Sequence, residues 1–258
     1  MRLSVSKIKL FKACRRAYEL KYVYGFEPVE KSDALVIGTS YHEKLEQLYK
    51  TGNFDCDFSK ESAMATAYKK YIYPKFRVDA VEGWMHLDLP DGNNLVGRLD
   101  GLSADGKLVE HKTSSISPLE YEYNLAWDEQ ILAYMLMSGT RQVYYTVCVK
   151  PTIRQKKNES DEEFFDRMVA WYDEDTDEKI ALIELSRTDE EVEQYRSELE
   201  EMSFEMNRTE KLGNYYRNTT HCKCWGRDCE YRSICLNCDP EQEYVGFNRK
   251  GILTCQEG

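Results

Sequence analysis

The feature that most constrains the fold is a set of three short apolar segments between residues 83 and 113, separated by two tight-turn sequences. The separators are Pro90-Asp91-Gly92-Asn93 and Ala104-Asp105-Gly106. Gly, Asn and Asp favour turns because they tolerate left-handed backbone angles or hydrogen-bond to nearby backbone groups. The segments at 83–89, 95–102 and 107–113 are therefore predicted to be strands.

The second turn also predicts a register. A three-residue hairpin loop with Gly in third place favours a type I turn followed by a left-handed residue, which pairs Ser103 with Lys107. Counted back along both strands, Asp100 lies opposite Glu110. Opposed residues share a face of the sheet, and so do residues two apart on a strand. Two carboxylates and the ammonium of Lys112 are therefore predicted to converge.

This combination suits metal-dependent hydrolysis. Carboxylate oxygens are preferred ligands of Mg²⁺ and Mn²⁺, which keep positions open for water and a substrate phosphate. Asp100 and Glu110 are candidate metal ligands, and Lys112 is a candidate for orienting or deprotonating the attacking water. The ordinary alternative is a solvated strand face with an ion pair, because the bare D…ExK spacing is common on exposed strands.

The remaining periodicity predicts an α/β fold with a mixed sheet flanked by helices. Gly52 stands just past one predicted helix as a stop signal. Helices are expected at 4–23, 35–49, 60–71, 123–137, 161–172 and 189–206, and further strands at 142–149 and 179–185.

Three residues on predicted helices accompany the hairpin. His42 could supply a neutral imidazole nitrogen to a metal, although a single helical His is more often a surface or core residue. Gln130 and Tyr134 are four residues apart and project from one helix face. They could hold a DNA backbone or brace the metal ligands, and ordinary amphipathic packing is the alternative.

The order of these motifs along the chain resembles that in the RecB-like branch of the PD-(D/E)XK nuclease superfamily. The matching motifs are Gly38–His42, Gly97–Asp100, Glu110–Lys112 and Gln130–Tyr134. The resemblance implies a restriction-endonuclease-like core. It also implies that His42, Asp100 and Glu110 bind the metal, that Lys112 is catalytic, and that Gln130 and Tyr134 support DNA binding. The match departs from the family at His111, where an apolar residue is commoner, and the side chain of His111 is expected to point away from the active face.

Cysteines are numerous and clustered. The chain has nine, and five of them lie between residues 222 and 238. Such crowding favours metal or cluster ligation over disulfides. The five residues are Cys222, Cys224, Cys229, Cys235 and Cys238.

The same family resemblance implies a 4Fe-4S cluster, with one cysteine before the nuclease motifs and three after them. Cys14 matches the N-terminal ligand, Cys229 and Cys235 match the C-terminal pair, and either Cys222 or Cys224 is the fourth. Thiolates suit an iron–sulfur cluster, but tetrahedral zinc takes similar ligands. Four ligands drawn only from the C-terminal cysteines would favour zinc.

The net charge of −11 argues against broad coating of nucleic acid, which relies on Lys and Arg. It leaves room for a local basic groove. The basic segment 150–157 could hold phosphates, or it could be an ordinary charged loop. No segment resembles a signal peptide or a membrane span, so an intracellular, cytoplasmic protein is expected. The family resemblance implies in addition that a phage or prophage encodes it.

These observations predict a Mg²⁺- or Mn²⁺-dependent DNA exonuclease that acts on single strands or duplex ends in recombination, repair or replication. The alternatives are a restriction-type endonuclease on the same fold and a non-catalytic cysteine-cluster module that binds DNA or protein. A single nuclease domain is expected over residues 1–258. Its expected parts are an N-terminal helical part (1–75), a catalytic core (76–150), a strand and long helix (151–210), and a cysteine-cluster lobe (211–258) that packs back on the N-terminus.

Overall fold

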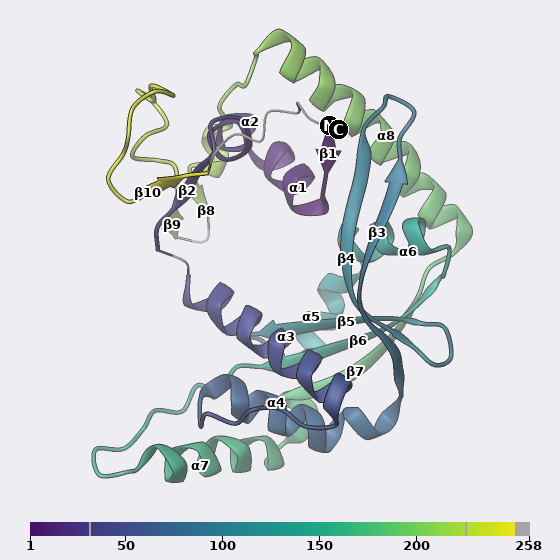
Figure 1. The fold of residues 1–258 in the computed structure, drawn as a ribbon, viewed down its shortest axis with the longest axis vertical. Helices are drawn as coiled ribbons and strands as arrows, with labels where there is room; N and C mark the ends of the chain where they lie inside the picture. Colours follow the sequence, from purple (N-terminus) through teal and green to yellow (C-terminus); the bar gives the residue numbers. More distant parts are fainter. Residues whose placement is uncertain (31, 225, 251–258) are drawn as a thin grey trace. The chain divides into compact units, whose positions relative to one another are not determined.

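The computed structural model describes residues 1–30, 32–224 and 226–250 (Figure 1). The chain divides into two compact units. Unit 1 comprises residues 1–31, 87–96 and 197–258, and unit 2 comprises residues 32–86 and 97–196. These boundaries differ from the expected parts, because residues 1–75 are divided after residue 31. In the described part of the chain, no helix is long and apolar enough to cross a membrane.

Unit 2 is built on a mixed β-sheet, as predicted. β4 and β5 are antiparallel, β5 and β6 are parallel, and β6 and β7 are antiparallel. β3 pairs with β4 on the other side. The strands are β3 (Val78–Asp88), β4 (Asn94–Ser103), β5 (Leu108–Ser114), β6 (Gln142–Val149) and β7 (Ile180–Ser186). The first residues of β4 and the last of β3 belong to unit 1.

Two helices with serine caps cover one face of this sheet. They are α3 (Asp33–Thr51), capped by Ser32, and α4 (Lys60–Tyr71), capped by Ser59. α3 ends at Gly52, whose φ of 76° gives it the left-handed conformation typical of a helix stop. The core between helices and sheet is aromatic and aliphatic, and its buried members include Tyr41, Leu45, Leu48, Met64, Tyr68, Ile72, Cys148, Tyr172 and Ile180.

The other helices of unit 2 include one correction. The helix predicted at 123–137 is two helices, α5 (Pro118–Leu125) and α6 (Glu129–Ser138). The chain breaks at Asp128, which adopts an extended conformation and accepts a hydrogen bond from the backbone N–H of Gln130. An aspartate at this position caps the start of a new helix. α7 (Asp161–Asp173) begins with a capping box, and the first residues of α8 (Asp189–Leu212) belong to unit 2.

Unit 1 contains a second correction. The single helix predicted at 4–23 is interrupted at Cys14, whose backbone is extended with φ −163° and ψ 113°. The interruption separates α1 (Val5–Ala13) from α2 (Arg15–Tyr18), which continues into a π-helical turn at Glu19–Val23. The remaining elements of unit 1 are short, namely β1 (Arg2–Leu3), β2 (Phe26–Pro28), β8 (Lys223–Cys224), β9 (Arg227–Asp228) and β10 (Phe247–Arg249).

Candidate active site

A tight hairpin joins β4 to β5 and sets which side chains face each other. Gly106 in its loop has a φ of +83°, a left-handed conformation that glycine adopts without strain. The register pairs Gly101 with Val109. The backbone N–H of Ser103 donates to the C=O of Lys107 at 2.9 Å, which confirms the predicted pairing of these two residues. Asp100 and Glu110 are the next residues beyond the pair of Gly101 and Val109.

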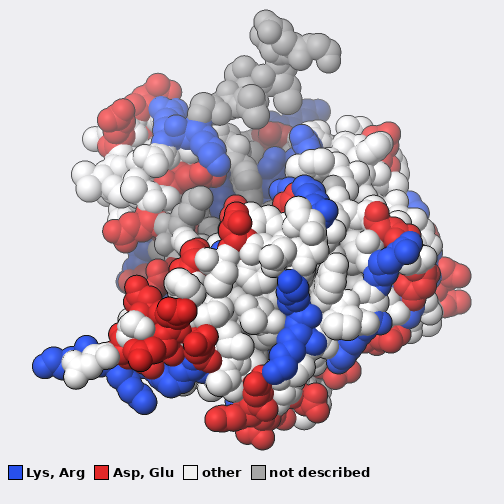
Figure 2. Space-filling view, turned by 60° about the horizontal axis from the view of Figure 1, so that its bottom comes forward, with Lys and Arg blue, Asp and Glu red and all other residues white. Residues whose placement is uncertain are grey.

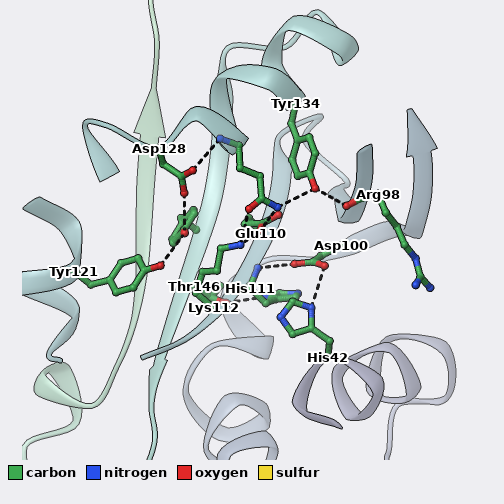
Figure 3. Close-up of polar contacts among 12 residues, drawn as sticks. His42, Arg98, Asp100, Glu110, His111, Lys112, Tyr121, Asp128, Tyr134 and Thr146 are labelled. Carbon is green, nitrogen blue, oxygen red and sulfur yellow. Dashed lines mark hydrogen bonds and ion pairs between the residues drawn. The ribbon is translucent and has the colours of Figure 1, made fainter. Parts of the chain in front are cut away.

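Asp100 is held by two neighbours where β4 and β5 begin to separate (Figure 3). Its Oδ2 accepts a hydrogen bond from the backbone N–H of His111 at 2.8 Å. Its Oδ1 lies 3.1 Å from Nδ1 of His42, which α3 supplies. Burial alone would raise the pKa of Asp100, but the hydrogen bond and charge of His42 and the His111 N–H lower it below the ordinary value. Asp100 is therefore a carboxylate that can bind a cation.

Glu110 is the most buried acid of the site, and its side chain is 3% exposed. Burial and the nearby charge of Asp100 raise its pKa, and the ammonium of Lys112 opposes this rise. Its Oε1 accepts hydrogen bonds from Nζ of Lys112 and from Nε2 of Gln130. Its Oε2 is buried without a hydrogen-bond partner among the described residues. A buried carboxylate oxygen without a partner is costly, which suggests a site that a ligand completes.

Lys112 supplies the positive charge of the site. Its Nζ donates to Oε1 of Glu110 and, at 2.9 Å, to Oε1 of Gln130. Burial would lower the pKa of Lys112, but Glu110, Asp100 and Asp128 together raise it. Its side chain is 24% exposed, so it lies partly open to solvent. In the protein alone, this ammonium forms an ion pair with Glu110, whereas Asp100 is paired with His42.

Gln130 and Tyr134 extend the site along α6. The amide of Gln130 donates to Oη of Tyr134 at 2.9 Å, and that hydroxyl donates to the backbone C=O of Arg98 at 2.8 Å (Figure 3). Gly97 explains why this packing is so close. A Cβ at Gly97 would lie 2.6 Å from Cε1 of Tyr134, far inside van der Waals contact. The glycine of the G-x-x-D motif therefore makes room for the tyrosine of the Q-x-x-x-Y motif.

His111 points away from the carboxylates, as predicted. Its Nδ1 lies 2.7 Å from Oγ1 of Thr146, and its Nε2 lies 3.3 Å from Oη of Tyr49. The ring of Tyr68 packs edge-on against it at 5.3 Å. Burial lowers the pKa of His111 to about 3, so the ring is neutral. The side chain braces the sheet from the α3–α4 face, while the backbone N–H of His111 positions Asp100.

Asp128 was missed by sequence reasoning, because one continuous helix was expected there. It caps α6 through the N–H of Gln130, and its Oδ2 accepts a hydrogen bond from Oη of Tyr145 at 3.3 Å. Tyr121 lies beside this pair (Figure 3). The signal was present in the sequence, since an aspartate directly before two good helix formers is typical of an N-cap.

The chemistry of the site suits a hard divalent cation, although its described side chains do not form a complete set of metal ligands. Among the described residues, no three His, Cys, Asp or Glu side chains converge as a ready-made metal site. The donors nevertheless fit Mg²⁺ or Mn²⁺, because Asp100 lies close enough for its charge to raise the pKa of Glu110, and Oε2 of Glu110 has no partner among the described residues. Nδ1 of His42 is already engaged by Asp100, so only its Nε2 remains available to a cation.

The predicted cysteine ligands lie in unit 1. Four of them, Cys14, Cys222, Cys229 and Cys235, line one cavity of about 430 Å³. The side chain of Cys224 lies outside what the structure describes. Cys238 interacts with Tyr244 and does not line the cavity.

Few polar contacts hold these thiols. Sγ of Cys14 accepts from the backbone N–H of Asn218 at 3.4 Å, and Sγ of Cys222 lies 4.0 Å from the C=O of Asn218. Burial, followed by the neighbouring thiols, raises the pKa of Cys229. Four soft donors around one cavity fit a thiolate-ligated metal or cluster. The extended backbone at Cys14 is the point at which the predicted helix breaks.

Comparison with known proteins gives a family match over most of the chain. The family model described as the PD-(D/E)XK nuclease superfamily matches residues 2–71 and 59–236. No protein of curated function matches the sequence.

Solved structures of similar fold include a protein from Eubacterium rectale that is thought to be an exonuclease. It is 16% identical, with a TM-score of 0.55, and the match covers 92% of this chain and 94% of that one. An alkaline exonuclease from Laribacter hongkongensis is 14% identical, with a TM-score of 0.36 and coverage of 82% and 93%. A phage-related exonuclease from Haemophilus somnus is 13% identical, with a TM-score of 0.37 and coverage of 74% and 93%.

Proposed function

The chain belongs to the PD-(D/E)XK nuclease superfamily, and from this premise we propose that it is a Mg²⁺- or Mn²⁺-dependent deoxyribonuclease. The observation that carries the proposal is the convergence of Asp100, Glu110 and Lys112 at the hairpin, with one oxygen of Glu110 buried and unpartnered. A structural ion pair would have no reason to leave that oxygen unsatisfied.

Each residue has a distinct role in this proposal. Asp100 and Glu110 hold the divalent ion, and His42 orients Asp100 or adds a nitrogen ligand. Once bound, the ion supplies Lewis acidity and an activated water. Lys112 holds the attacking water and balances charge near the scissile phosphate. Gln130 fixes the positions of the Lys112 ammonium and the Glu110 carboxylate through its amide. Tyr134 is buried and supports DNA binding indirectly, by holding Gln130 in place.

The direct test is cleavage of labelled DNA by the purified protein with Mg²⁺, compared with Asp100→Ala and Lys112→Ala. The wild type should cleave and both variants should not. Cleavage of equal rate by all three proteins would show that the activity belongs to a contaminant or to another site. A protein that binds DNA without metal-dependent cleavage would support the non-catalytic module instead.

We further propose that the enzyme is an exonuclease on single strands or duplex ends, serving recombination, repair or replication, plausibly in a phage or prophage. The motif order supports this assignment. The rival is a restriction-type endonuclease on the same fold. Closed circular and linearised forms of one DNA distinguish the two, because an exonuclease degrades only the linear form and an endonuclease cuts both.

We propose that Cys14, Cys222, Cys229 and Cys235 hold a 4Fe-4S cluster. The common cavity that these four side chains line supports the set. Cys224 stays the alternative to Cys222, because its side chain lies outside the described part of the structure. A ligand set that includes Cys14 also argues against a zinc site made only of the C-terminal cysteines. Anaerobic purification with metal analysis decides the matter, because a cluster gives a brown protein containing iron and sulfide, and the zinc alternative gives a colourless one.

A further inference from the structure

Lys150, at the carboxyl end of β6, and Lys60, the first residue of α4, are not used by the site described above. Lys150 directly follows β6, and its backbone N–H donates to the C=O of Ser114, the last residue of β5, at 2.9 Å. β5 and β6 are parallel, with Lys112 level with Val147. Lys150 is three residues further, which corresponds to roughly 10 Å along the strand direction. Ligands commonly bind beyond the carboxyl ends of parallel strands.

Packing brings the segment after Lys150 against the first turn of α4. Ile153 packs on a buried cluster that contains Ala63 of α4 and Phe165 of α7. Ala63 lies in the turn that begins at Lys60, since its backbone N–H donates to the C=O of Ser59 at 3.1 Å. The side chains of Lys60 and Lys150 are therefore carried by two segments that pack together, and both are partly buried.

Neither ammonium is neutralised by the protein. Within the described ranges, no carboxylate lies within ion-pair distance of Lys60 or Lys150. Partial burial, followed by the charge of Lys60, lowers the pKa of Lys150. The chain has a net charge of −11, so two adjacent cations without an acidic partner are unexpected for stability alone. Such a pair is expected where an anion binds.

The basic loop beyond these lysines is held in a fixed shape. Arg167 of α7 donates to both carboxylate oxygens of Glu159, at 2.6 and 2.7 Å, and to the backbone C=O of Arg154 at 2.8 Å. The backbone N–H of Lys156 also donates to Glu159. Both oxygens of Glu159 are thus engaged, and Arg154, Lys156 and Lys157 are exposed. In Figure 2, Lys and Arg side chains project at the extremity where Figure 1 places the segment before α7.

We propose that Lys60 and Lys150 bind a backbone phosphate of the DNA substrate on the α4 side of the catalytic centre. The braced loop with Arg154, Lys156 and Lys157 extends the same phosphate-binding track. The inference rests on the proposed function, since it assumes that the strand bound here is the strand cleaved at Lys112. The contacts are to phosphates, so the track orients the DNA without reading its sequence.

The test measures DNA binding separately from cleavage. Fluorescence anisotropy with labelled single-stranded DNA is recorded in Ca²⁺ without Mg²⁺, for the wild type and for Lys60→Gln/Lys150→Gln. We expect the Kd to rise about tenfold, and the slope of log Kd against log salt to become shallower by about 0.7, since the loss of one phosphate contact on a single strand removes about 0.7. Lys60→Arg/Lys150→Arg should restore binding, because it restores the charge.

Lys70→Gln is the matched control. Lys70 lies on the same helix, but its ammonium is paired with Asp173 at 2.8 Å, so its loss should leave DNA affinity unchanged. Arg154→Gln/Lys156→Gln/Lys157→Gln should weaken binding of long strands only. Unchanged affinity and salt slope in the Lys60/Lys150 variant would overturn the proposal, even if the wild type cleaves DNA. If the Lys60/Lys150 variant binds DNA more weakly but the wild type cleaves no DNA, the phosphate-binding track is supported and the proposed function is overturned.

Discussion

The catalytic hairpin and the cysteine cavity both collect side chains from distant parts of the sequence, but the protein holds them in different ways. At the hairpin, Asp100 and Glu110 each have two hydrogen-bond partners from the chain itself. At the cavity, the contacts of Cys14 and Cys222 are long, at 3.4 and 4.0 Å, and the surrounding strands have two residues each. The first site is preorganised by the protein, whereas the second depends on what its thiols bind.

Because the protein's own hydrogen bonds hold the hairpin site, variants of its carboxylates are predicted to lose activity and to keep their fold. Asp100→Asn keeps the shape of the side chain and an oxygen for the His111 N–H, but removes the charge that a cation requires. We expect the rate of Mg²⁺-dependent cleavage to fall at least about 10³-fold, as for other charge-stabilising groups. Initial rates and the thermal unfolding midpoint are measured on the same preparation. A large fall in the midpoint would contradict the preorganisation of this site.

Cysteine variants should show the opposite pattern. Cys14→Ser and Cys229→Ser each remove one proposed ligand of the group that would join distant segments of unit 1. If that link contributes about 2–4 kcal/mol, as a covalent cross-link does, the unfolding midpoint falls by roughly 5–10 °C. Cys238→Ser is the control, since Cys238 does not line the cavity. Equal effects of all three substitutions on bound metal and on the midpoint would refute the assigned ligand set.

Two glycine substitutions test whether close packing against Tyr134 explains the glycine of the G-x-x-D motif. Gly97→Ala places a methyl group 2.6 Å from the ring of Tyr134, so overpacking should cost about 1–3 kcal/mol and reduce cleavage. Gly38→Ala meets only Oγ1 of Thr113, at 3.8 Å, and alanine favours a helix by up to about 1 kcal/mol. Urea unfolding should therefore show opposite signs for the two variants. The same sign for both would mean that close packing at Gly97 is not the reason for the motif.

The smallest predicted effect is the pH dependence that His111 gives to the free energy of unfolding. The folded-state pKa of His111 is lowered to about 3 from an ordinary 6.5, so the unfolded chain binds the extra proton first as the pH falls. The contribution of His111 to stability is complete above pH 6.5 and declines below it, by about 1 kcal/mol between pH 6.5 and 5.5. His42 acts in the opposite sense, since Asp100 raises its pKa.

The difference between the wild type and His111→Gln isolates this contribution, because His42 is present in both proteins. Urea unfolding in a metal chelator at several pH values gives the two stability curves. The variant should lose less stability than the wild type over this pH interval. Parallel curves would mean that His111 is not held neutral by burial.

Local signals account for what the sequence could predict. The hairpin register followed from turn residues and strand alternation, both properties of a few adjacent residues. The breaks at Cys14 and Asp128 were missed because helical periodicity continues through them. At Asp128 the extended backbone belongs to a local N-cap, whereas Cys14 is contacted by Asn218 from far along the chain. The close approach of Gly97 to Tyr134 depends on how α6 packs on β4, which no local pattern encodes.

The central claim is that Asp100 and Glu110 together seat one divalent ion. Isothermal titration with Mn²⁺ tests it most directly, using the wild type, Asp100→Asn and Glu110→Gln, with Cys238→Ser as a control. The account predicts one Mn²⁺ site that either carboxylate substitution abolishes and the control retains. Undiminished Mn²⁺ binding in both carboxylate variants would contradict it.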